Sequence, residues 1–178
     1  SSNIHPIDVA KTIKIMNALL DVGANPKNAH YSYISNLYQK TGWYELMNRM
    51  IDGGFDVNAK NYEGKTLLMS MCCSYAIIAD LQSFRLVLNA GADVNARTEN
   101  NRTALHYLSI SDANIKHDVM KLIIDRGADV NVVDHLQKTP LQYVVDNGDC
   151  DAFSMLIAAG KEKKKIDNHI VDQSKEIS

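Results

Sequence analysis

Apolar residues recur at the spacing of one helical face in five stretches along the chain. Apolar side chains three and four positions apart predict amphipathic helices. A short helix of this kind cannot bury its apolar face alone, so we expect the helices to stack around one elongated core. The five groups are Ile13, Met16, Leu19 and Leu20; Leu46, Met47, Met50 and Ile51; Phe84, Leu86, Val87 and Leu88; Val119, Met120, Leu122, Ile123 and Ile124; and Phe153, Leu156 and Ile157.

A short phrase that begins with glycine follows these predicted helices. It reads Gly-Phe-Asp-Val-Asn-Ala-Lys at 54–60, Gly-Ala-Asp-Val-Asn-Ala-Arg at 91–97 and Gly-Ala-Asp-Val-Asn-Val-Val at 127–133, with partial copies at 23–26 and 158–160. The glycines at 23, 54, 91, 127 and 160 are 31, 37, 36 and 33 residues apart. A period of this size indicates a repeat array. We expect Gly54, Gly91, Gly127 and Gly160 to close helices, because glycine readily takes positive φ.

A second phrase keeps a fixed distance from the first. Eight residues after Asn58, Asn95 and Asn131 come Thr-Leu-Leu-Met at 66–69, Thr-Ala-Leu-His at 103–106 and Thr-Pro-Leu-Gln at 139–142. Threonine suits a helix N-cap and proline suits the first helical position. Together the two phrases resemble the ankyrin repeat over about residues 10–160. The resemblance implies an all-α repeat solenoid of helix-turn-helix units linked by β-hairpin fingers, with about four full repeats and partial terminal caps.

The repeat register also suggests boundaries. We expect residues 1–22 to form an N-terminal partial repeat or cap, and residues 23–160 to form the ankyrin repeat array. Residues 161–178 begin with the lysine-rich run 161–165, which predicts a C-terminal capping helix or a frayed charged tail. The lysine run is either a solvated face or a contact for phosphate or an acidic partner.

Some positions depart from the repeat pattern. The glycine before the threonine is present as Gly64 but is replaced by Asn101 and Gln137, and we expect the last hairpin to be distorted because glutamine rarely takes a left-handed backbone. The turns near 74–79 and 111–116 are lengthened, which favours a local rim on neighbouring repeats. Residues 33–36 lack the threonine phrase altogether.

Composition narrows the functional classes. The 178 residues include 19 basic and 21 acidic residues, a net charge of −2, so there is no general attraction to nucleic acid. No apolar run reaches the roughly 20 residues of a membrane span. The three cysteines form no disulfide framework, which favours a reducing compartment and a cytoplasmic location. We expect a monomer that binds another protein, with no nucleic acid and no membrane partner.

Each side chain of reactive type has a structural interpretation and a reactive alternative. His106 is interpreted as a hydrogen-bonding histidine between helix and hairpin, with a catalytic base as the alternative. Cys72 and Cys73 are interpreted as buried small apolar residues, with a reactive thiol as the alternative. The spacing of cysteines and histidines fits no zinc site. We therefore expect no catalytic residue, no metal and no cofactor, and a protein that is not an enzyme.

The resemblance also implies a binding surface. In ankyrin arrays the hairpin tips and the first helices line one concave groove, and its residues differ between members. Tyr62, Arg97 and Arg102 have the character of interface anchors, with solvated loop residues as the alternative. Trp43 and Tyr44 either pack on a neighbouring turn or contact a partner. The candidate partner-binding residues are Lys60, Tyr62, Glu63 and Lys65; Arg97, Glu99, Asn100 and Arg102; and Val133, His135, Leu136 and Lys138.

The sequence therefore predicts a protein–protein interaction module that docks a partner on the concave groove. The diverged repeats and abundant Asn, Ile, Lys and Tyr are similar to ankyrin proteins of intracellular pathogens and large DNA viruses that engage host proteins; a eukaryotic adaptor and a bacterial antitoxin-like binder stay open. The alternative is a structural spacer or targeting segment of a larger protein whose catalytic or effector domains lie outside this chain. A ligand-binding or enzymatic role would require a closed pocket with convergent polar groups.

Overall fold

The structure, a computed structural model, describes residues 9–28, 42–73, 80–112 and 115–161. Within these ranges the chain forms helices and turns and no β-strand, so the expected hairpins are present as turns without a β-ladder. Residues 150–161 are also helical. The named elements are α1 (Val9–Asp21), the 3-10 helix η1 (Pro26–Asn28), α3 (Trp43–Asp52), α4 (Leu67–Cys72), α5 (Leu81–Asn89), α6 (Ala104–Ile110), α7 (Lys116–Asp125) and α8 (Pro140–Asn147).

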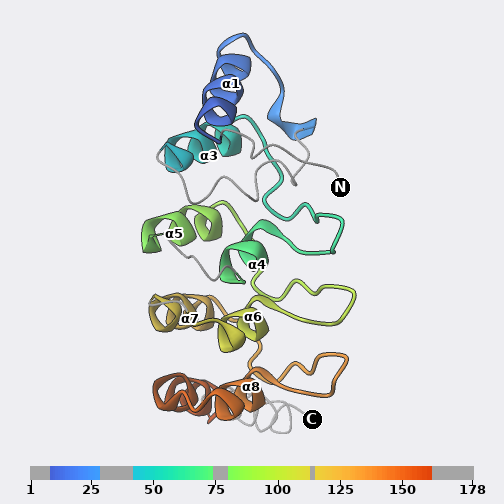
Figure 1. Cartoon of the computed structure of the whole chain (residues 1–178), viewed down its shortest axis with the longest axis vertical. Helices are drawn as coiled ribbons and strands as arrows, with labels where there is room; N and C mark the ends of the chain where they lie inside the picture. Colours follow the sequence, from blue (N-terminus) through green and yellow to red (C-terminus); the bar gives the residue numbers. More distant parts are fainter. Residues whose placement is uncertain (1–8, 29–41, 74–79, 113–114, 162–178) are drawn as a thin grey trace, which may run out of the picture.

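The helices form two rows in repeat order (Figure 1). An outer row contains α3, α5 and α7, and an inner row contains α4, α6 and α8. The loops that join an outer helix to the next inner helix all project to the same side, beyond the inner row. Helix α6 packs against α4, α7 and α8, and α5 packs against α7. This arrangement confirms the predicted all-α repeat solenoid.

The central repeats bury the predicted apolar stripes. Phe84 and Val87 of α5 and Met120 and Ile123 of α7 are inaccessible to solvent, as is Leu105 of α6. These side chains come from consecutive repeats and belong to one connected core. Stacking of neighbours therefore provides the burial that no single repeat could provide alone.

The expected core is wrong at two positions near the ends of the array. Leu19 of α1 is 50% exposed and Phe153 in the last helix is 42% exposed, although both were placed in the apolar stripes. Phe153 lies seven residues before Gly160, and the residues seven before Gly91 and Gly127, Phe84 and Met120, are fully buried. No described repeat stacks beyond the last one, so its outer apolar side chains lack that cover.

The ends of the helices follow the predicted caps. The Thr66 hydroxyl accepts a hydrogen bond from Met69 N–H and begins α4. Thr139 does the same for Gln142, and the Gln142 side chain accepts from Thr139 N–H at 2.8 Å. This reciprocal pair satisfies two backbone donors at the start of α8, where Pro140 needs none.

The closing glycines behave as predicted at three of four positions. Gly54, Gly91 and Gly127 have φ values of 90°, 90° and 87°, in the left-handed region that ends a helix without steric cost. Gly160 is the exception, because the last helix continues through residue 161. The prediction that Gly160 ends a helix is therefore wrong: its backbone stays helical, which glycine permits as well as the left-handed turn.

We call the three projecting loops finger 60–65, finger 97–102 and finger 133–138. Each is closed in the same way, by backbone bonds from Asn61 N to Lys65 O, Thr98 N to Arg102 O and Asp134 N to Lys138 O, at 2.9–3.0 Å. The expected distortion of the last finger is not found. Gln137 adopts a left-handed backbone with φ 59°, where Gly64 has φ 71°. The Asp134 side chain accepts from Leu136 N and Lys138 N and holds this turn.

Replacing Gln137 by glycine should stabilise the protein by about 0.5–1 kcal/mol. A left-handed backbone costs a residue with a side chain roughly 1 kcal/mol or more, and the added freedom of glycine in the unfolded chain offsets part of the gain. Urea unfolding measures the difference. The control is Gly64→Ala, where φ is also positive and the added Cβ meets only ordinary contacts, the nearest at 3.5 Å. This control should lose about 1 kcal/mol. A destabilised Gln137→Gly would contradict the account of strain.

Successive repeats are joined by asparagine side chains. The Asn58 amide donates to Gly91 O at 3.0 Å and accepts from Asp93 N at 2.8 Å. Asn95 repeats the arrangement one unit later, donating to Gly127 O at 3.1 Å and accepting from Asp129 N at 2.7 Å. Each asparagine thus satisfies two backbone groups of the next repeat. This explains why the phrase Asp-Val-Asn recurs.

Candidate partner-binding surface

The three fingers lie one above the other beside the inner helices (Figure 1). Hydrogen bonds run directly between them: Lys60 Nζ donates to Arg97 O at 2.9 Å, Asn101 Nδ2 donates to Val133 O, and His135 N donates to Asn100 O at 3.0 Å. The structure therefore brings the sequence-predicted candidate residues onto one continuous surface. The bonds between fingers also fix their spacing.

Several candidate residues point into solvent. Tyr62 is 83% exposed and Leu136 is 55% exposed, and Val133 is also exposed. The candidates Glu63, Glu99, Asn100 and His135 are exposed as well. Exposed apolar and aromatic side chains on a fixed frame are typical of surfaces that bind other proteins.

Cations at the bases of the fingers lie against tyrosines of the inner helices. Lys65 Nζ is 5.3 Å from the ring centre of Tyr107, and Lys138 Nζ is 5.3 Å from that of Tyr143. Both tyrosines were missed by the sequence reasoning. The available signal was their position, four residues after Thr103 and Thr139, on the side of the inner helix nearest the fingers. Such contacts attract the cation to the face of the ring.

Arg102 is engaged inside the chain. Its Nε is 3.0 Å from Asp134 Oδ2 and its Nη2 donates to the Tyr143 hydroxyl at 2.9 Å. The Tyr143 hydroxyl donates in turn to Asp134 Oδ2 at 2.7 Å. The Asp134 side chain is fully buried. Burial alone would raise its pKa, but the hydrogen bonds from Tyr143 and Arg102 hold the pKa well below its usual range. Arg102 therefore joins two adjacent repeats.

A hollow of about 260 Å³ lies in the groove between the first two fingers. Lys65 and Arg102 flank it on the finger side, and Cys73, Tyr107 and Ile110 line it from the inner helices, with Ser111 beside them. Burial alone would lower the pKa of Lys65, but the hydrogen bond with Glu63 and the nearby charges of Cys73, Tyr107 and Glu63 together raise it, so Lys65 stays charged. Burial raises the pKa of Cys73, which keeps the thiol protonated and disfavours the reactive-thiol alternative. Cys72 is fully buried, as predicted, whereas Cys73, which was also predicted to be buried, is only partly buried at the end of α4.

His106 confirms its interpretation as a hydrogen-bonding residue. The Nδ1 atom accepts from Thr103 N at 3.1 Å, which leaves the proton on Nε2 to be donated to Lys138 O at 3.2 Å. The side chain is fully buried, and this burial lowers its pKa, so the ring is neutral at pH 7. His106 thus ties finger 133–138 to α6.

The other residues and site types considered in the sequence have the following outcomes in the structure. Trp43 is buried in the core, which confirms the packing interpretation, whereas Tyr44 is exposed. No group of three potential metal ligands occurs in the described ranges. Among the described helices, none has the length and apolar character needed to cross a bilayer. The lengthened turn at 74–79 lies outside the described residues, as do residues 33–36 and most of 161–178.

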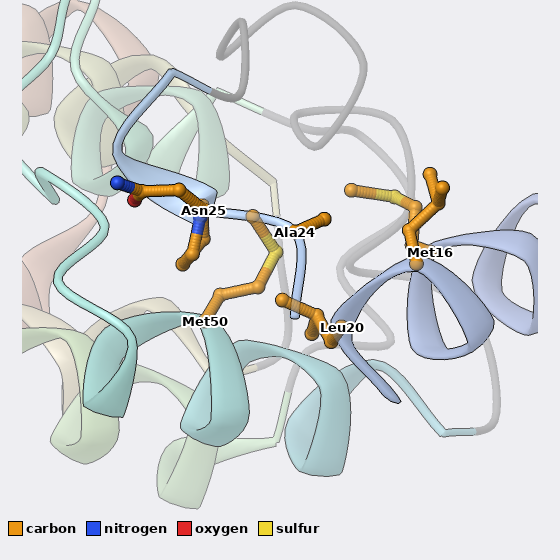
Figure 2. A pocket seen from close by; sticks show the side chains of 7 residues that line it. Met16, Leu20, Ala24, Asn25 and Met50 are labelled. Carbon is orange, nitrogen blue, oxygen red and sulfur yellow. The ribbon is translucent and has the colours of Figure 1, made fainter. Parts of the chain in front are cut away.

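A second hollow, of about 220 Å³, lies between α1, η1 and α3. Figure 2 shows Met50 of α3 reaching toward Ala24 and Leu20 of the preceding segment. Its lining is apolar except for Asn25, whose side-chain oxygen already accepts from Lys27 N at 2.9 Å. The hollow therefore offers apolar contact and no convergent polar groups of the kind that orient a substrate.

The chain was compared with curated protein sequences and with models of protein families. No curated protein sequence matches the chain. The family model for ankyrin repeats in three copies matches residues 35–134 and 75–167, which together cover about three quarters of the chain. The match spans the array of fingers and paired helices described above. The chain belongs to the ankyrin repeat family.

Proposed function

We propose that this chain is a non-catalytic protein-binding module that holds a partner protein in the groove between its fingers and α4, α6 and α8. Ankyrin repeats are in general protein–protein interaction modules. The observation that carries the proposal is the row of three fingers, bonded to one another and presenting Tyr62 and Leu136 to solvent. A surface that is already ordered loses little conformational entropy on binding.

The proposal includes several finer points. The partner is a protein of a host cell, the module acts in the cytoplasm, and it is a monomer on its own. The free thiols of Cys72, Cys73 and Cys150 support a reducing compartment. Residues 23–160 are the repeat array, residues 1–22 are a partial repeat or cap, and residues 161–178 are a capping helix or a frayed charged tail.

The test removes exposed finger side chains that make no contribution to the core. A partner is captured from lysate, identified by mass spectrometry, purified and titrated against the chain. Tyr62→Ala combined with Leu136→Ala should weaken binding at least about thirtyfold, because a single interface anchor commonly contributes about 2 kcal/mol. Circular dichroism checks that the variant stays folded.

The matched control is Lys121→Ala, an exposed residue of α7 in the outer row. It should bind like the wild type. Arg102→Ala is unsuitable as a functional variant, because Arg102 holds the buried Asp134. If Lys121→Ala abolished binding while the finger variant bound normally, the partner would use the outer face and the groove proposal would be wrong. A chain with no saturable partner would favour the spacer alternative.

A further inference from the structure

The three fingers together carry more positive than negative charge. Fingers 60–65 and 97–102 each contain two cationic residues and one glutamate, and finger 133–138 contains one aspartate and one lysine. The three fingers together carry a net charge of +2 with histidine neutral, whereas the whole chain carries −2. The candidate surface is therefore cationic although the chain as a whole is acidic.

The five finger cations differ in whether a carboxylate of the chain already pairs with them. Lys65, Arg102 and Lys138 each pair with a carboxylate, of Glu63, Asp134 and Asp146 respectively. Lys60 and Arg97 are exposed, and their hydrogen bonds go to neutral oxygens, Arg97 O and Asn101 Oδ1. Among the described finger residues, Lys60 and Arg97 therefore keep a charge without a carboxylate within ion-pair distance.

The same register position becomes apolar on the third finger. Lys60, Arg97 and Val133 each lie two residues after the bridging asparagine position of their repeat. Val133 is exposed, and so is Leu136 near the tip of the same finger. Across the three fingers the surface thus changes from two cations to an apolar patch.

We propose that the groove binds an acidic segment of a partner protein, whose carboxylates lie against Lys60 and Arg97 and whose apolar side chain lies against Val133 and Leu136. This inference rests on the proposed function. Charge-assisted hydrogen bonds to carboxylates are stronger than neutral ones, and complementary charge selects partners. Glu63 and Glu99 add negative charge to the same two fingers, which disfavours the continuous negative charge of a nucleic acid backbone.

The test selects binders from a displayed library of random 16-residue peptides, using the full chain at 150 mM salt. Enriched peptides should be rich in Asp and Glu and carry an aliphatic residue. The charge-reversal variant Lys60→Glu with Arg97→Glu should weaken their binding at least tenfold, and wild-type binding should weaken as salt rises. The matched control, Arg85→Glu with Lys121→Glu, makes the same charge change at exposed outer-row positions and should bind normally.

Each other result has a defined meaning. Enriched peptides without excess acid, binding that is unchanged by charge reversal, or no enrichment at all would overturn this inference. Equal binding of a mixed-sequence single-stranded oligonucleotide would overturn it too. If neutral peptides were enriched and their binding required Tyr62 and Leu136, the proposed groove function would hold and only the preference for acidic segments would be wrong. If acidic peptides bound but ignored every finger variant, the groove itself would be wrong.

Discussion

Leu105→Ala should lower the free energy of unfolding by about 2–5 kcal/mol, the range for removing a large aliphatic side chain from a packed core. Leu105 is fully buried in α6, which packs against α4 and α8 of the repeats on either side. The cavity would lie in a helix that packs against both neighbouring repeats. Urea unfolding of the wild type and of Leu105→Ala gives the difference in the free energy of unfolding.

Lys121→Ala serves as the comparison, because Lys121 is exposed on α7 and surface changes usually stay within about 0.5 kcal/mol. Equal losses in the two variants would refute the view that stacking of neighbouring repeats stabilises this array.

Asp134→Ala should cost about 3 kcal/mol. The Asp134 carboxylate is fully buried, and its removal leaves Arg102 and the Tyr143 hydroxyl without their acceptor. Breaking such a pair from one side costs much more than breaking an exposed pair. Asp21→Ala is a matched control, because Asp21 pairs with Arg49 but is mostly exposed, and should cost at most about 1 kcal/mol. Similar losses for both would show that burial of Asp134 adds nothing.

The effect of Asp134→Ala should also depend on pH. The pKa of Asp134 is far below its unfolded value of about 4, so its contribution to stability is present above that value and is lost as the pH falls below it. The wild type should therefore lose more stability than Asp134→Ala between pH 5 and pH 2. Urea midpoints at several pH values measure the difference in stability between the wild type and Asp134→Ala. A difference that stayed constant in acid would contradict the ion-pair account.

The sequence was sufficient for the frame because local rules repeat in it. The threonine caps, the apolar stripes and the closing glycines each depend on only a few neighbouring residues, and Thr66, Gly91 and Phe84 were predicted correctly. Their fixed spacing also placed the fingers together, which is why the candidate residues share one surface. The family model independently supports the repeat assignment.

The details that sequence reasoning missed depend on contacts between repeats. The left-handed Gln137 is an exception, because Asp134 of the same finger holds its turn, but the partners of Arg102 lie 32 and 41 residues away. Exposure of Phe153 depends on the absence of a described neighbour beyond it. Propensity and local spacing carry no information about these longer contacts. For the same reason Arg102 looked like a free anchor although its side chain is already engaged.

The bridging asparagines have a consequence for how such a chain can change in evolution. The side chains of Asn58 and Asn95 bond to backbone atoms of the next repeat, so this part of the junction does not depend on which side chains follow. A whole repeat duplicated in frame would meet a junction with the same hydrogen bonds on both sides. The array can therefore lengthen or shorten by complete units while these asparagine bonds are kept, and substitutions at exposed finger tips such as Tyr62 leave these bonds unchanged.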